Sequence, residues 1–379
     1  MSAPRPLTSR IAHDYPVVAP VLGVVVLLLT WGRDLGAVPV AVVAVVLVTV
    51  VLAAVHHAEV IAHRVGEPFG SLVLAVAVTV IEVGLILTLM VSGGDKTATL
   101  ARDTVFAAAM ITMNGIVGLS LVAGALRHGV PRFNAEGAGS ALATVLSVAT
   151  LSLVLPNFTT SSPGAQFSGP QLAFAAVGSA ALWLIFVLTQ TGRHREFFLP
   201  VTDDLDPPGL GPDLQDELAA AEEAGTPTRR RALVSLWLLL LALVAVVGLA
   251  KVESPAIEDG VAAAGFPQSF VGVVIALVVL LPETLASVRA ARRNLMQTSL
   301  NLAYGSAMAS IGLTVPAIAV ASIWLEGPLV LGLGPVQMVL LLLTAVVSVL
   351  TLVPGRATRL EGAVHLTLFA AFVFLSINP

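Results

Sequence analysis

Residues 265–289 read GFPQSFVGVVIALVVLLPETLASVR, an apolar segment that contains one carboxylate. The segment carries no charge until Pro282 and Glu283, which arrive before the apolar pattern ends. A carboxylate inside a bilayer costs roughly 2.5–3.5 kcal/mol on insertion scales, so it is seldom present without a function. Proline removes a backbone donor and loosens the helix beside the charge. The segment therefore predicts a transmembrane helix that is disturbed next to a functional glutamate.

A second segment, residues 70–92 (GSLVLAVAVTVIEVGLILTLMVS), has the same arrangement around Glu82. Glu82 and Glu283 are the only formally charged residues deep inside the predicted spans, and no Lys or Arg lies within a span to pair with them. Desolvation raises the pKa of a carboxylate and a bound cation lowers it, so such a pair can exchange protons for a metal ion. The alternative is that each glutamate is a neutral hydrogen-bonding partner within the helix bundle.

The composition indicates a polytopic, all-α membrane protein. Of the 379 residues, 57% are hydrophobic and 11% are charged, and the mean hydropathy is +0.95. The apolar windows suit helical spans of about 20 residues. They are far longer than the roughly 10-residue alternating strands of a membrane barrel. The chain has no cysteine, which excludes disulfides and thiolate metal sites. The N-terminal segment lacks an A-x-A-like cleavage site and is expected to be an uncleaved first span.

The hydropathy pattern predicts about eleven spans. They cover approximately residues 17–32, 37–56, 70–92, 104–126, 137–156, 170–191, 232–250, 267–288, 299–324, 335–353 and 360–377. With the N-terminus inside, the outer segments hold only Arg33, Lys96, Arg102 and Lys251 of the 19 basic residues. This asymmetry follows the positive-inside rule. We expect a multi-pass protein of the bacterial inner (plasma) membrane, with a cytoplasmic N-terminus and an external C-terminus.

The predicted spans divide the chain into four parts. These are an N-terminal tail with an extra first span (1–36), a five-helix repeat (37–192), a cytoplasmic acidic linker (193–231) and a second five-helix repeat (232–379). Each repeat carries its glutamate in its second span. Because five is odd, the two repeats must insert with opposite orientation, which is the inverted-repeat plan of many secondary transporters.

The middle of the linker, residues 201–226, contains acidic residues and no basic one. It is either a solvated tether or a segment that attracts the cation and regulates transport. The candidate regulatory residues are Asp213, Asp216, Glu217, Glu222 and Glu223.

Hydroxyl and amide side chains near the two glutamates are candidate additional ligands. They are Thr79, Ser287, Thr112, Asn114, Ser306 and Ser310, with Asn114 and Ser306 the strongest. The alternative is that small polar residues simply allow membrane helices to pack closely.

The stretch HHAEVIAHRVGE (56–67) places His56, Glu59 and His63 on one helical face. Zinc could bind there, which would suit a membrane metalloenzyme. The stretch contains no HExxH motif and no second ligand cluster, however, and it lies at the inner end of a span. A cytoplasmic vestibule or proton path, which could include Glu67, and a solvated helix end are the other readings. His365, alone in the last span, is predicted to be structural.

Charge balance favours a divalent ion. Two carboxylates are neutralised by one divalent cation or by two protons, and oxygen-only ligands suit hard cations such as Ca²⁺. We expect Glu82 and Glu283 to bind Ca²⁺ and to exchange it for protons. The alternatives are a Na⁺(K⁺)/H⁺ antiporter on the same site, an ion channel and a zinc-dependent membrane enzyme. No resident cofactor and no nucleic-acid partner is expected; the partners are the bilayer and the transported ions, and the sequence does not specify an oligomer.

Two segments resemble a known family. Residues 282–318 (PETLASVRAARRNLMQTSLNLAYGSAMASIGLTVPAI) and 56–87 (HHAEVIAHRVGEPFGSLVLAVAVTVIEVGLIL) resemble bacterial calcium/proton antiporters of the cation/proton exchanger family, within the calcium/cation exchanger superfamily. The resemblance extends over nearly the whole chain. It implies inverted repeats, alternating access and a central cation- or proton-binding acid in each repeat, here Glu82 and Glu283. Many members carry a GN-x-x-E-like signature, whereas this chain reads TVIE (79–82) and LLPE (280–283). The departure leaves selectivity between Ca²⁺ and Na⁺ or K⁺ open.

Overall fold

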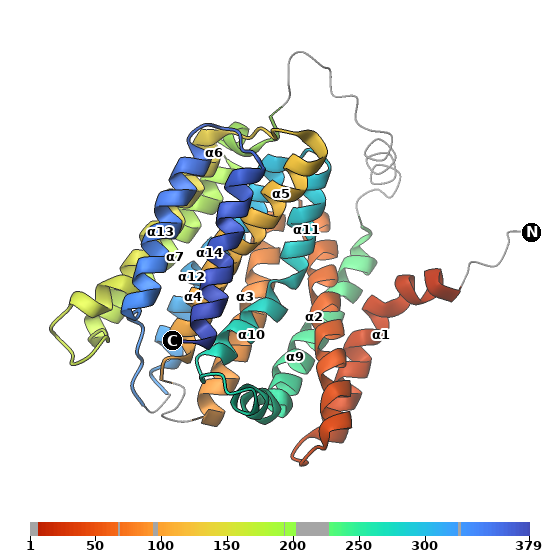
Figure 1. Cartoon of the computed structure of the whole chain (residues 1–379). Coiled ribbons are helices and arrows are strands. Elements are labelled where there is room, and N and C mark those ends of the chain that lie inside the picture. Colours follow the sequence, from red (N-terminus) through yellow and green to blue (C-terminus); the bar gives the residue numbers. More distant parts are fainter. Residues whose placement is uncertain (1–6, 67–68, 94–97, 193, 202–226, 325–326) are drawn as a thin grey trace, which may run out of the picture. The chain divides into compact units, whose positions relative to one another are not determined.

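A computed structural model describes residues 7–66, 69–93, 98–192, 194–201, 227–324 and 327–379 (Figure 1). The described residues form helices and no strand, apart from an isolated bridge between Arg132 and Arg356. The all-α prediction is therefore confirmed. The helices are α1 (Leu7–Thr30), α2 (Ala37–Val65), α3 (Phe69–Gly93), α4 (Leu100–Met110), α5 (Val117–His128), α6 (Ala135–Ala149), α7 (Gly169–Thr191), α9 (Arg229–Ala263), α10 (Phe270–Val279), α11 (Leu281–Arg292), α12 (Met296–Ala321), α13 (Pro335–Leu352) and α14 (Arg359–Ile377).

Several spans are not continuous α-helices. A π-helical segment, η2 (Ile111–Ile116), joins α4 to α5, and another, η3 (Thr150–Val154), continues α6 into the 3₁₀ turn η4 (Leu155–Phe158). A second 3₁₀ turn, η5 (Arg195–Phe198), follows α7. Such π-helical segments are rare and often occur at functional sites.

The number of spans differs from the sequence-based count. Within the described residues, eight helical stretches are long and apolar enough to cross a membrane, and the bent pair α10–α11 would make a ninth. Two shorter apolar helices, Tyr15–Thr30 and Val76–Val91, overlap the predicted spans 17–32 and 70–92. Length and composition therefore confirm a multi-span membrane protein but not the count of eleven.

One compact unit contains residues 1–92 and 226–260, which hold α1, α2, α3 and most of α9. Its helices approach closely where one of them carries glycine. A Cβ atom added to Gly84 of α3 would lie 2.6 Å from Cγ2 of Val247 in α9. Close approach at small residues is the usual way for membrane helices to pack.

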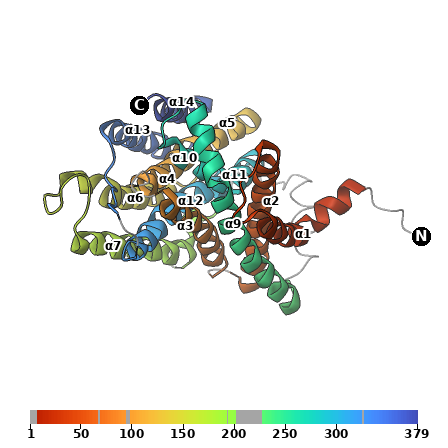
Figure 2. The ribbon, with the colours of Figure 1, turned by 90° about the horizontal axis from the view of Figure 1, so that it is seen from below.

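The other compact unit contains residues 93–225 and 261–379. Its central helix is α12, which packs against α6, α7 and α11, while α5 lies beside α14 (Figure 2). Helices α4 and α10 meet at Gly272, where an added Cβ would lie 2.9 Å from the backbone nitrogen of Thr104. The division into units follows contacts rather than sequence order, so the predicted repeats 37–192 and 232–379 stay a prediction.

Candidate functional site

Glu283 lies directly after a break in its span. Helix α10 ends at Val279, Leu280 leaves the helical conformation with φ −87° and ψ 2°, and α11 continues at an angle of 55°. Pro282 fits the first turn of α11 because the backbone donors there have no partner within the helix. The predicted disturbance beside Glu283 is therefore confirmed. The break places the partly buried carboxylate in the first turn of α11, where the helix dipole stabilises negative charge.

Glu82 has a different setting. It lies within the continuous helix α3, and its side chain is only 2% exposed. Thr79, one turn earlier, is also buried. The two glutamates belong to different compact units, Glu82 with α1, α2 and α9, and Glu283 with α4–α7 and α10–α14. Their joint role stays a prediction.

The residues expected near Glu283 lie on two packed helices. Ser287 follows Glu283 by one turn of α11 and is fully buried. Helix α11 packs against α12, which carries the half-buried Ser306 and the buried Ser310. The hydroxyl of Thr284 donates to the backbone oxygen of Leu280 at 2.7 Å, across the break. Ser287, Ser306 and Ser310 stay predicted ligands.

Thr112 and Asn114 lie in the π-helical segment η2, and both are fully buried. The Thr112 hydroxyl donates back to the oxygens of Ala108 and Ala109, at 2.8 and 3.0 Å. Asn114 instead bonds to other helices. Its amide nitrogen donates to Oγ1 of Thr344 in α13 at 2.9 Å, and its Oδ1 lies 3.1 Å from Nδ1 of His365 in α14.

These contacts form a continuous chain of hydrogen bonds. Thr351 Oγ1 lies 3.2 Å from His365 Nε2, and Thr344 Oγ1 lies 3.7 Å from the sulfur of Met110. One assignment satisfies every contact: Thr351 donates to Nε2, Nδ1–H donates to Asn114, and the Asn114 amide donates to Thr344. His365 thus fixes which way the Asn114 oxygen points. Sequence reasoning gave His365 only a structural role, although a polar side chain in an apolar span is itself a sign of a buried network.

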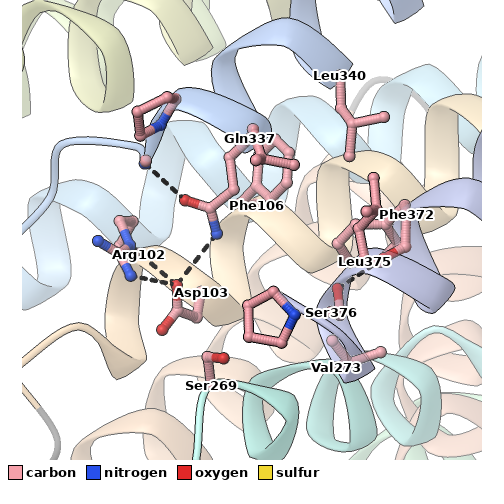
Figure 3. Close-up of a pocket in the computed structure, with 14 residues that line it drawn as sticks. Arg102, Asp103, Phe106, Ser269, Val273, Gln337, Leu340, Phe372, Leu375 and Ser376 are labelled. Carbon is pink, nitrogen blue, oxygen red and sulfur yellow. Dashed lines mark hydrogen bonds and ion pairs between the residues drawn. The ribbon is translucent and has the colours of Figure 1, made fainter. Parts of the chain in front are cut away.

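A cavity of about 270 Å³ opens at the ends of α4, α10, α13 and α14 (Figure 3). On its polar side, Arg102 forms an ion pair with Asp103 at 2.8 Å, and Gln337 Nε2 donates to Asp103 at 3.3 Å. Thr99 donates to the second carboxylate oxygen at 2.8 Å, so both oxygens of Asp103 accept hydrogen bonds. Phe106, Leu340, Phe372 and Leu375 line the apolar side.

Sequence reasoning missed two buried carboxylates. Asp103 is 4% exposed and Glu253 in α9 is 3% exposed. Helix α4 begins before the predicted span 104–126, and α9 continues beyond the predicted span 232–250. Asp103 and Glu253 therefore lay outside the predicted spans. An acidic residue in the first turn of a helix, as at Asp103, could have signalled the earlier start of α4.

The stretch at the end of α2 is arranged differently from the expected cluster. His57, which was not singled out, is 3% exposed and lies 2.8 Å from the Pro16 oxygen and 3.3 Å from Ser235 Oγ. His56 is half-buried, while Glu59 and His63 are exposed. Within the described ranges, no three His, Asp or Glu side chains gather as metal ligands would. Glu67 and the linker residues Asp213, Asp216, Glu217, Glu222 and Glu223 lie outside the described residues.

The known proteins that this chain resembles are ion exchangers and transporters. The family model "Sodium/calcium exchanger protein" matches residues 35–192 and 234–378. The chain is 47% identical to y4hA of Sinorhizobium fredii, an ionic transporter by name, over 87% of this chain and 86% of that one. It is 33% identical to ChaA of Escherichia coli, a sodium-potassium/proton antiporter, over 94% of both chains.

Two solved structures have the same fold. The H⁺/Ca²⁺ exchanger CAX aligns with a TM-score of 0.71, covering 97% of this chain and 89% of that one. Native YfkE aligns with a TM-score of 0.70, covering 97% and 99%. Each is 16% identical to this chain, so these two likenesses concern the fold alone.

Proposed function

Because the chain belongs to the sodium/calcium exchanger protein family, we propose that it exports cytoplasmic Ca²⁺ in exchange for external protons. The family match confirms the expectation of an ion exchanger rather than an enzyme. The proposed setting is the bacterial inner membrane, with the N-terminus in the cytoplasm and the C-terminus outside. Two five-helix repeats of opposite orientation would alternate access to one site, and the two separately matched segments support this plan.

The observation that carries the proposal is the position of Glu283 at the break between α10 and α11. Broken helices in transporters expose helix ends and backbone groups to the transported ion. In the proposed cycle, Glu82 and Glu283 bind one Ca²⁺ from the inside, because two carboxylates balance its charge. Each carboxylate takes a proton when the ion leaves on the outside, and the protonated pair returns. Asn114, Ser306, Thr79, Thr112, Ser287 and Ser310 are the proposed additional oxygen ligands.

Exchange of Na⁺ or K⁺ for protons is the second candidate. The observation that favours it is the similarity over 94% of the chain to ChaA, whose name states sodium-potassium/proton antiport. The sequences TVIE and LLPE also offer few side-chain oxygens next to the glutamates. A site with fewer oxygens places fewer demands on the size and charge of its ion.

The test uses everted membrane vesicles with an acidic interior and a fluorescent pH probe. Ca²⁺, Na⁺ and K⁺ are added separately to vesicles that contain the unmodified protein, Glu82→Gln or Glu283→Gln. The exposed Glu136 at the start of α6 provides a matched control, Glu136→Gln. We expect Ca²⁺ to trigger proton release that both site variants lose and the control keeps.

Each other outcome has a definite meaning. Equal release with Na⁺ or K⁺ would favour the second candidate. Cation flux without proton release would indicate a channel. Full exchange by either site variant at normal abundance in the membrane would refute the assignment of the two carboxylates.

A further inference from the structure

A second cavity, of about 510 Å³, lies within the other compact unit, where the middle of α1 and the C-terminal part of α2 meet the N-terminal end of α9. Its basic lining comes from His56, His57, Arg230 and Arg231, and none of the described residues that line it is a carboxylate. The remaining wall is largely apolar, with Val60 and Val234 among its residues. The cavity thus combines a cationic part with an apolar part.

The cavity is held together by a buried side chain. His57 of α2 contacts the backbone oxygen of Pro16 in α1 and the hydroxyl of Ser235 in α9. Ring nitrogens that bond to two different helices fix the imidazole and join all three elements around the opening. His57 thus ties the three helices together on the inner side of the cavity, while Arg230 and Arg231 lie exposed at its opening.

The charge around this cavity favours binding of an anion. Helix α9 begins with Arg229, Arg230 and Arg231, although a helix N-terminus already carries partial positive charge and normally favours acidic residues. Neither Arg230 nor Arg231 forms an ion pair with any residue that the structure describes. Positive charge thus accumulates here without compensation from the described part of the chain.

We propose that this cavity binds the phosphate headgroup of an anionic phospholipid. Arginine guanidinium groups match phosphate oxygens with paired hydrogen bonds. Basic pockets between transmembrane helices are suited to anionic headgroups, and the apolar wall offers a surface for the glycerol and the first acyl carbons. Both α2 and α9 are long and apolar enough to span a membrane, so their ends lie at headgroup depth. This site is separate from the proposed exchange site and does not depend on its chemistry.

The test measures lipid binding to the purified full-length protein in detergent by native mass spectrometry. The probes are phosphatidylglycerol, phosphatidylcholine and inorganic phosphate. The site variant is Arg230→Gln/Arg231→Gln. The control is Arg64→Gln/Arg229→Gln, which removes the same charge from exposed positions on α2 and α9 that do not line the cavity.

We expect phosphatidylglycerol to bind the unmodified protein and the control alike, and the site variant about 30-fold more weakly. Phosphatidylcholine should bind all three forms equally. An equal loss in the control would mean general surface attraction and would overturn the proposal. Displacement of the lipid by millimolar inorganic phosphate would replace the lipid site with a phosphate-ion site.

A third variant tests whether the acidic linker, rather than a lipid, supplies the negative charge that the cavity binds. Deleting residues 203–223 removes most of the acidic linker that precedes α9. Unchanged lipid binding after the deletion supports the proposal. Binding that occurs only after the deletion would mean that the linker's own carboxylates occupy the cavity, and this would overturn the assignment to lipid.

Discussion

Replacing His365 tests whether it orients Asn114 for cation binding. The imidazole is fully buried and reaches Asn114 through Nδ1 and Thr351 through Nε2. The amide nitrogen of an introduced Asn can take the place of Nδ1, whereas that of a Gln reaches the place of Nε2. His365→Asn therefore keeps the bond to Asn114, and His365→Gln keeps the bond to Thr351 instead.

The magnitude follows from the bond that each variant loses. In His365→Gln, the buried Oδ1 of Asn114 loses its donor, which costs about 1–3 kcal/mol. The amide can then rotate and turn its nitrogen toward the cation's place. Since about 1.4 kcal/mol corresponds to a factor of ten, we expect the half-saturating cation concentration to rise by roughly 5- to 150-fold. His365→Asn should change it by less than about threefold.

The assay is the vesicle exchange measurement, with the cation concentration varied at constant pH. Thr351→Val is the matched control, because it removes the contact at Nε2 without touching Asn114. Equal effects of the Asn and Gln replacements, at equal protein abundance, would refute the reasoning. They would show that His365 stabilises the bundle without orienting Asn114.

Three further outcomes are expected. Asp103→Asn should lower unfolding stability by about 3 kcal/mol, because it leaves the partly buried guanidinium of Arg102 without its carboxylate, and thermal unfolding in detergent measures this. Gly84→Ala should cost about 1–3 kcal/mol in the same assay, since the new Cβ would meet Val247 at 2.6 Å. Deleting residues 203–223 should change the half-saturating Ca²⁺ concentration in vesicles but leave the maximal exchange rate intact.

Each of these has its own control. Adding Arg102→Gln to Asp103→Asn should restore part of the lost stability, and no restoration would mean that the ion pair is not the cause. Gly178 in α7 has no atom within 4 Å of an added Cβ, so Gly178→Ala should not destabilise the protein. Exchange with unchanged kinetics after the linker deletion would make residues 203–223 a simple tether.

The features that sequence could predict are those set by local chemistry. Continuous apolar windows predicted helical spans because a bilayer leaves backbone groups no partner outside the helix. The break beside Glu283 was predictable because Pro282 acts on its own turn of helix, whatever surrounds it.

The features that sequence could not predict depend on distant partners. Asn114 bonds to Thr344 and His365, which lie 230 and 251 residues further along the chain. The sequence around residue 114 does not indicate these partners. His56 and His57 are adjacent and chemically identical. Which of them is buried depends on how α1 and α9 pack against α2, because neighbouring helical residues point in different directions.

The break at Leu280 also makes α11 a rigid segment that could rotate about that residue. The helix is 12 residues long, or about 18 Å at 1.5 Å per residue. A rotation of about 10° at Leu280 would therefore move the Arg292 end by about 3 Å. Helix α11 packs against both α5 and α12, so neither neighbour could stay in place during that movement. A change of the two backbone angles of Leu280, next to the carboxylate, would thus move the far end of α11 and displace α5 and α12.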